Sequence, residues 1–82
     1  MEMPKEPRVN LVGERVKTAR RRRNPPLTQD DLSGQLAAQG IQLDRVAICR
    51  IELGTRYVSD VELRAFSRAL GVSPAWLLGM ER

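Results

Sequence analysis

The sequence predicts an all-α domain of five helices, and three observations support this fold class. Apolar residues recur at intervals of three and four along several segments, which is the spacing of one face of a helix. Most of these segments begin at a Ser, Thr or Asp suited to an N-cap and end near a Gly or a Pro. No segment alternates apolar and polar residues over the length of a strand. With 82 residues, the chain holds one domain at most.

Two prolines among the first eight residues predict a flexible basic arm over residues 1–8, ahead of a domain over residues 9–82. The first helix is expected at residues 9–23, where small apolar residues recur at helical spacing: Val12, Val16 and Ala19. Asn24-Pro25-Pro26 ends this helix, because a residue before proline is displaced from the α region.

The second helix is predicted to begin after Thr28, an N-cap residue followed by Asp31 three positions later. Leu32 and Leu36 form its apolar stripe, and Gly40 is the expected C-cap.

Asp44 is the expected N-cap of the third helix. Leu43 and Ile48 flank it at the spacing of a hydrophobic staple. Ile48 and Ile51 share the inward face of this helix, and Gly54 ends it.

Ser59 and Glu62 match a capping box that opens the fourth helix, and Gly71 ends this helix. Its inner face is predicted to hold Leu63, Phe66 and Leu70. Ser73-Pro74 is typical of an N-cap followed by the first residue of a short fifth helix.

Composition excludes several classes of function. With one cysteine and no histidine, the chain can form neither an internal disulfide nor a Cys/His zinc site, and it lacks the usual general base. We therefore expect no catalytic residue, no metal and no cofactor. The longest apolar runs, residues 46–49 and 75–78, are too short to cross a bilayer, and the N-terminus lacks the features of a signal peptide. These features predict a soluble cytoplasmic protein without a membrane partner.

The positive charge is concentrated at the N-terminal end. The net charge is +4, and residues 1–23 contain eight basic and three acidic side chains, a balance of +5. A basic chain of this kind favours a polyanionic partner.

The predicted third helix is the best candidate for a binding surface. If Ile48 and Ile51 face inward, then Arg45, Val46, Cys49 and Arg50 lie on the other faces. Arginine bonds guanine O6 and N7 in the major groove of DNA, and an apolar side chain contacts the thymine methyl group. The alternative is that these residues form an ordinary solvent-exposed surface, and Cys49 is either a small apolar side chain or a redox-sensitive thiol.

Three sequence blocks extend this interpretation. They are L-T-Q-D-D-L at residues 27–32, I-C-R-I-E-L-G at residues 48–54 and A-L-G-V at residues 69–72. In this order they resemble the λ-repressor/Cro-like (XRE-type) helix-turn-helix family, over about residues 11–78. The resemblance implies a compact five-helix DNA-binding domain whose second and third helices form the helix-turn-helix.

The resemblance also implies roles for individual residues. Arg45, Val46 and Arg50, with Cys49 beside them, match positions that read base edges. Phosphate contacts are implied for Thr28, Gln29 and Arg56, and Gln29 also braces the recognition helix. Arg20 and Glu52 are implied to form a structural ion pair.

This chain departs from the usual family pattern at three points. Ser33 replaces alanine, Cys49 replaces serine, and the connection between Leu36 and Ile48 is about five residues longer. Because the turn sets the angle at which the third helix would dock, the longer turn affects the register of Arg45 on DNA.

The remaining basic residues have two interpretations each. Arg21, Arg22 and Arg23 either bind phosphates or lie in water at the helix C-terminus, where the helix dipole favours them. The arm residues Lys5 and Arg8 either follow a DNA groove or are disordered.

One recognition helix covers too few base pairs for specific binding, so we expect a homodimer on a palindromic operator. The dimer interface is predicted in the C-terminal region, at Val72, Pro74, Ala75 and Leu78. Trp76 either packs in the core against Phe66 or anchors the dimer. The expected function is transcriptional regulation as a repressor. The alternatives are an antitoxin that holds a protein partner and the controller of a restriction–modification system.

Overall fold

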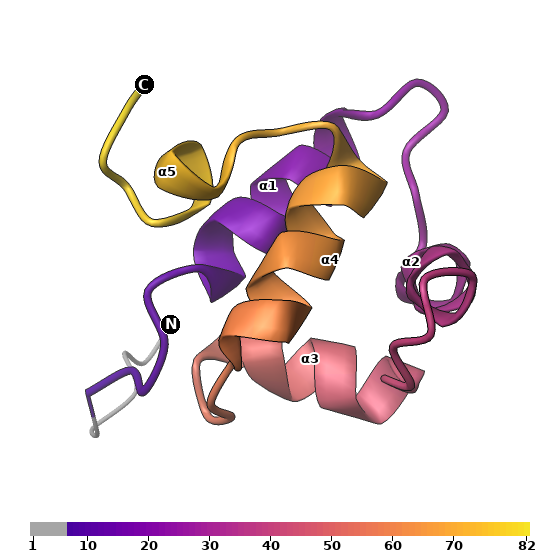
Figure 1. Ribbon diagram of the computed structural model, residues 1–82, viewed down its shortest axis with the longest axis horizontal. Helices are drawn as coiled ribbons and strands as arrows, with labels where there is room; N and C mark the ends of the chain where they lie inside the picture. Colours follow the sequence, from indigo (N-terminus) through magenta and orange to yellow (C-terminus); the bar gives the residue numbers. More distant parts are fainter. Residues whose placement is uncertain (1–6) are drawn as a thin grey trace, which may run out of the picture.

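Five helices follow one another in the computed structural model, which describes residues 7–82 (Figure 1). They are α1 (Gly13–Arg22), α2 (Gln29–Ala37), α3 (Arg45–Leu53), α4 (Asp60–Leu70) and α5 (Pro74–Leu77). These residues contain no strand. The predicted all-α class with five helices is therefore confirmed for the described part of the chain.

The helices begin where the sequence places their caps. Thr28 and Ser59 each open a capping box, with Asp31 and Glu62 as the partners three residues later. The Asp44 side chain accepts a hydrogen bond from the Ala47 N–H at 2.8 Å, and Ser73 caps α5 in the same way. These caps satisfy backbone donors that have no partner within their own helix.

Two helix boundaries differ from the prediction. Helix α1 begins at Gly13 rather than at residue 9, because the preceding segment is bound to the end of α3: the Val9 N–H donates to the Gly54 carbonyl at 2.9 Å. Helix α2 ends at Ala37 with Ala38 as its C-cap, so Gly40 is not the C-cap. Gly40 instead adopts a positive φ of 80° within the turn that follows.

The long connection between α2 and α3, residues 38–44, is attached to the body of the domain. The Ser33 hydroxyl donates to the Leu43 carbonyl at 2.6 Å, and the Gln39 amide donates to the Ala65 carbonyl at 3.0 Å. Ser33, which departs from the family pattern, therefore has a structural role in this chain. It fixes the residues that lead into α3.

The core is formed by one cluster of buried apolar side chains from all five helices. Its largest fully buried members are Phe66, Leu32, Leu36, Ile48, Ile51, Leu77 and Val16. Trp76 is only half-buried, and its ring packs under the Arg15 guanidinium, 4.9 Å from the ring centroid. Trp76 therefore packs against the edge of the core, and the fully buried position of α5 belongs to Leu77.

Helices α3 and α5 lie at different ends of the molecule. Helices α1 and α4 pack against each other, while α3 lies across one end and contacts α1 and α2 (Figure 1). Helix α5 contacts α1 and α4 and lies away from α3 (Figure 1). Among the described helices, none is long and apolar enough to cross a membrane.

Candidate nucleic-acid interface

Helix α3 has a buried face and an exposed face. Ile48 and Ile51 are completely buried. Arg45, Val46 and Arg50 are exposed. Two guanidinium groups and a branched apolar side chain therefore protrude from a helix that is held on its opposite side.

An apolar stripe runs along the exposed face, and the sequence analysis missed one of its members. Leu53 is 58% exposed and Val46 is 51% exposed. Half-buried Cys49 lies between them in the sequence at helical spacing. The interval of seven residues from Val46 to Leu53 is two helical turns, so this signal was available in the sequence. Arg45 and Arg50 flank the stripe.

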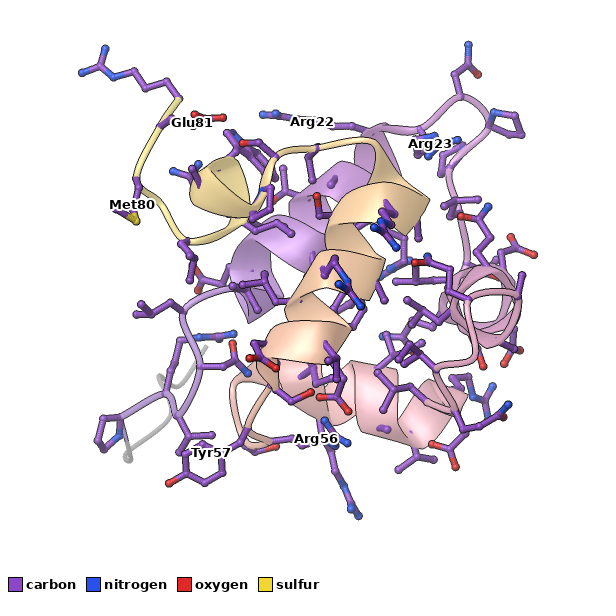
Figure 2. The ribbon with its side chains drawn as sticks, viewed as in Figure 1. Arg22, Arg23, Arg56, Tyr57, Met80 and Glu81 are labelled. Atoms are coloured by element: carbon purple, nitrogen blue, oxygen red, sulfur yellow. The ribbon has the colours of Figure 1, made fainter. Side chains whose placement is uncertain are left out.

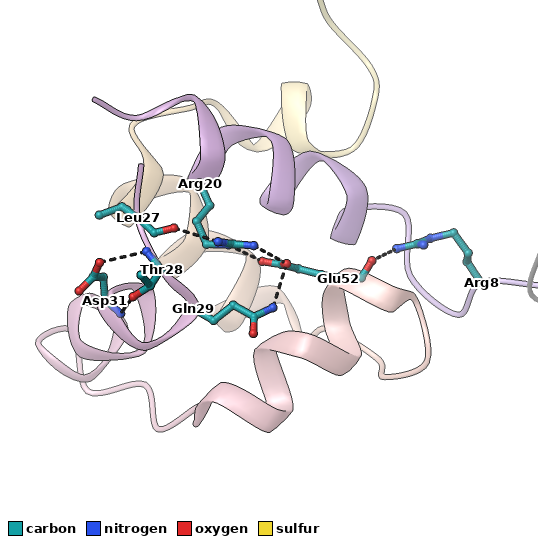
Figure 3. Close-up of polar contacts among 7 residues, drawn as sticks. All are labelled: Arg8, Arg20, Leu27, Thr28, Gln29, Asp31 and Glu52. Atoms are coloured by element: carbon teal, nitrogen blue, oxygen red, sulfur yellow. Dashed lines mark hydrogen bonds and ion pairs between the residues drawn. The ribbon is translucent and has the colours of Figure 1, made fainter. Parts of the chain in front are cut away.

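A buried ion pair attaches α3 to α1 (Figure 3). Arg20 Nε lies 2.8 Å from Glu52 Oε2, and Arg20 Nη2 donates to Oε1 at 2.9 Å. The Gln29 amide donates to the same Oε1 at 3.1 Å, and Arg20 Nη1 donates to the Leu27 carbonyl at 2.8 Å. The structure thus brings Arg20, Glu52 and Gln29 together at the junction of α1, α2 and α3.

The residues before α1 hold the other end of α3. Asn10 is only 8% exposed, and its amide donates to the Ile51 carbonyl at 3.0 Å and to the Arg56 carbonyl at 2.8 Å. Its side-chain oxygen accepts from the Gly13 N–H. The role of Asn10 was not predictable from the sequence, because the two carbonyls to which it donates are more than forty positions away.

Arg8 also belongs to this attachment. Its Nη2 donates to the Glu52 carbonyl at 2.9 Å, as Figure 3 shows. The guanidinium also packs over Gly54, where an added Cβ would lie 2.7 Å from the Arg8 Cζ. Arg8 was assigned to the arm by the sequence but is bound to the domain. Lys5 lies outside the described residues.

A polar groove adjoins the N-terminal end of α3. Its volume is about 540 Å³, and Arg20, Arg21, Thr28, Gln29 and Arg45 are among the residues that line it. Two predicted phosphate-binding residues, Thr28 and Gln29, are therefore brought next to Arg45. Arg21 joins them.

The Thr28 end of this groove is also a helix cap. The Thr28 N–H donates to the Asp31 carboxylate at 2.9 Å, and this bond lowers the pKa of Asp31, with the Thr28 hydroxyl adding to the effect. Asp31 therefore keeps a negative charge in the first turn of α2, where the helix dipole favours it.

Arg56 is engaged within the protein. Its Nη1 and Nη2 donate to the two oxygens of Glu62 at 3.1 Å and 3.2 Å. This hydrogen bonding raises the pKa of Arg56. A phosphate bound by Arg56 would have to compete with the Glu62 carboxylate.

Arg22 and Arg23 do not join the α3 surface. Figure 2 shows them at the end of the molecule opposite to Arg56 and Tyr57, which follow α3. Arg23 Nη1 donates to the Ala69 carbonyl at the C-terminal end of α4, at 3.2 Å. Arg22 and Arg23 thus lie apart from the exposed face of α3.

The residues predicted to form a dimer interface surround α5. Pro74 is exposed, whereas Val72 and Leu78 are half-buried against the core and Ala75 is half-buried too.

Three more exposed apolar residues were missed by the sequence analysis: Leu11, Tyr57 and Met80. Leu11 and Tyr57 line a groove of about 380 Å³ together with Leu63 and Leu78.

Residues 7–82 contain no group of three or more His, Cys, Asp or Glu side chains placed to hold a metal ion. Comparison of the chain with models of protein families, with curated proteins and with solved structures finds no match.

Proposed function

We propose that this chain is a sequence-specific, double-stranded DNA-binding regulator of transcription of the helix-turn-helix type. The observation that carries this proposal is the division of α3 into a fully buried side, with Ile48 and Ile51, and an exposed side, with Arg45 and Arg50. A rigid helix that presents two arginines is suited to the major groove of B-DNA.

Each exposed residue of α3 has a chemical role in this proposal. The guanidinium groups of Arg45 and Arg50 donate to guanine O6 and N7. The methyl groups of Val46 and the Leu53 side chain contact thymine methyl groups. Arg21, Thr28 and Gln29 hold a phosphate at the groove beside Arg45, which sets the register of α3 on the duplex.

We propose a symmetric homodimer because a single α3 covers only a few base pairs. The groove lined by Leu11, Tyr57 and Leu78 supports this part of the proposal, because it is bordered by exposed apolar side chains. Tyr57 follows α3 closely in the chain. Pairing at this face would bring the C-terminal ends of two α3 helices towards one axis, with half-sites about 34 Å apart.

A protein-interaction module, such as the antitoxin of a toxin–antitoxin pair, is the second candidate function. The exposure of Leu11, Tyr57 and Met80 favours it, because a partner protein would cover these side chains. The two functions are separated by whether the protein alone selects a DNA sequence.

The test is selection of bound duplexes from a random-sequence pool by the purified chain. The proposal predicts an enriched palindrome with half-sites one helical turn apart. It also predicts that log K falls by about 0.9 per log unit of salt for each phosphate that is neutralised. Recovery of unselected sequences, or binding that is independent of salt, would contradict it.

A further inference from the structure

The run of four arginines at the end of α1 is divided between two surfaces. Arg20 is bound to Glu52, and Arg21 lines the groove beside Arg45. Arg22 and Arg23 instead line a separate pocket, away from Arg56 and Tyr57 (Figure 2). The proposed contact with DNA therefore leaves these two cations without a role.

This pocket has an apolar wall and a charged rim. Its volume is about 400 Å³, which is within the range of small-molecule sites. Its apolar wall is formed by the half-buried side chains of Val72 and Trp76, which lie over the buried core residues Ala19 and Leu70. Arg22, Arg23, Arg82 and Glu81 also line it. Three guanidinium groups and one carboxylate therefore surround an indole ring and aliphatic surface.

The positive charge at this rim is not neutralised by ion pairs. Within residues 7–82, the ion pairs involve Arg8, Arg20 and Arg56, and neither Arg22 nor Arg23 takes part in one. Arg23 forms one hydrogen bond, to the Ala69 carbonyl. An anion in the pocket would therefore be attracted by positive charge that no ion pair offsets.

The C-terminal segment brings the single carboxylate to the pocket. The Ser73 hydroxyl donates to the Glu81 carboxylate, and Arg15, which covers one face of Trp76, donates to the Glu81 carbonyl at 3.3 Å. Glu81 is thereby held beside the arginines. The negative charge of Glu81 opposes the binding of an anionic ligand in this pocket.

We infer that this pocket binds a small amphipathic anion, in which a planar apolar body contacts Trp76 and Val72 and an acidic group accepts hydrogen bonds from Arg22. The acidic group is a carboxylate or a phosphate monoester, both of which accept paired hydrogen bonds from guanidinium groups. The site is independent of the proposed recognition of DNA by α3.

Trp76 makes the inference directly measurable, because it is the only tryptophan in the chain and its indole N–H gives a single NMR signal. The full chain is titrated with 2-naphthoate, 2-naphthyl phosphate and the uncharged 2-naphthalenemethanol. We expect a saturable shift of the indole signal with one or both anions. Whichever anion binds more tightly identifies the acidic group, and the alcohol should bind at least about tenfold more weakly, the equivalent of one lost charge-assisted hydrogen bond.

Charge variants separate this site from the α3 surface. Arg22→Ala/Arg23→Ala should weaken binding of the anion by about tenfold or more, whereas the matched pair Arg45→Ala/Arg50→Ala should leave it unchanged. Glu81→Gln keeps the hydrogen bond from Ser73 but removes the charge, so it should tighten binding. Circular dichroism checks that each variant is folded.

Three results would overturn the inference. The first is the absence of a saturable Trp76 shift with either anion. The second is equal affinity for the uncharged alcohol, and the third is unchanged affinity in Arg22→Ala/Arg23→Ala. A Trp76 shift caused by duplex DNA and lost in that variant would instead assign the two arginines to the DNA backbone.

Discussion

Arg20 and Glu52 lie 32 positions apart in the sequence, and yet they form a two-point ion pair between α1 and α3, with N–O distances of 2.8 Å and 2.9 Å. Only 12% of the Arg20 side chain and 4% of the Glu52 side chain are exposed. The pair therefore fixes the orientation of α3 from its buried side, while Arg45 and Arg50 remain free to contact a ligand.

Removing one partner of this pair should destabilise the fold strongly. Glu52→Ala leaves the buried Arg20 guanidinium without a carboxylate, and we expect a loss of about 3–5 kcal/mol in the free energy of unfolding. Urea denaturation followed by circular dichroism measures it. Glu62→Ala is the matched control, because it breaks the more exposed pair with Arg56. An equal loss in the free energy of unfolding for the two variants would contradict the claim that the buried position of Glu52 makes its ion pair more important.

Replacing Asn10 should lower the free energy of unfolding by as much as replacing many core residues. Asn10→Ala removes one of two donors to the Ile51 carbonyl, the donor to the Arg56 carbonyl and the acceptor of the Gly13 N–H, so we expect a loss of about 2–3 kcal/mol in the free energy of unfolding. Thermal and urea unfolding measure this loss. The exposed Asn24→Ala should change stability by less than about 0.5 kcal/mol. Equal effects of the two changes would show that the Asn10 contacts contribute nothing.

Two glycines should respond in opposite directions to replacement by alanine. An added Cβ at Gly13 would lie 2.0 Å from the Ile51 carbonyl oxygen, so Gly13→Ala must displace the backbone of α3 and should cost about 3 kcal/mol. Gly34 lies inside α2 with no atom within 4 Å of an added Cβ. Gly34→Ala should therefore stabilise the protein by about 0.5–1 kcal/mol. A Gly13→Ala variant as stable as the wild type in urea would contradict the close approach of α1 and α3.

The Glu62 carboxylate should make stability depend on pH below neutrality. Burial acts to raise the pKa of Glu62, but hydrogen bonds from Arg56 and Ser59 outweigh it and leave the pKa lowered. Because its pKa is lower in the folded state, Glu62 stabilises the fold above its unfolded pKa, and this contribution is lost as the pH falls through the folded pKa. Glu62→Gln should cost about 1 kcal/mol or less at pH 7. The difference between variant and wild type should shrink as the pH falls below the unfolded pKa of Glu62, and a difference that stays constant during acidification would rule out this linkage.

Local features of the fold were predictable from the sequence, because caps act within one helical turn. Thr28, Asp44, Ser59 and Ser73 each cap the helix that follows, as expected. The inward position of Ile48 and Ile51 was likewise encoded in their spacing.

Contacts between distant segments were not predictable in the same way. Asn10 looked like part of the first helix, since nothing near it in the sequence reveals its partners at residues 51–56. Arg22 and Arg23 continue the run from Arg20, but each residue turns the helix by about 100°, so neighbouring arginines face different surfaces. Only the packing of α4 and α5 against α1 determines which surface each one reaches.

The most direct test of the central claim is to compare arginine variants on the DNA sequence that the protein selects. Arg45→Ala and Arg50→Ala should each cost about 1–3 kcal/mol of binding free energy on that duplex and relax the preference at one base position. Arg68→Ala, which removes the same charge from an exposed position on α4, should have little effect. An equal loss in all three variants, or no loss in Arg45→Ala and Arg50→Ala, would contradict the assignment of α3 as the helix that reads DNA.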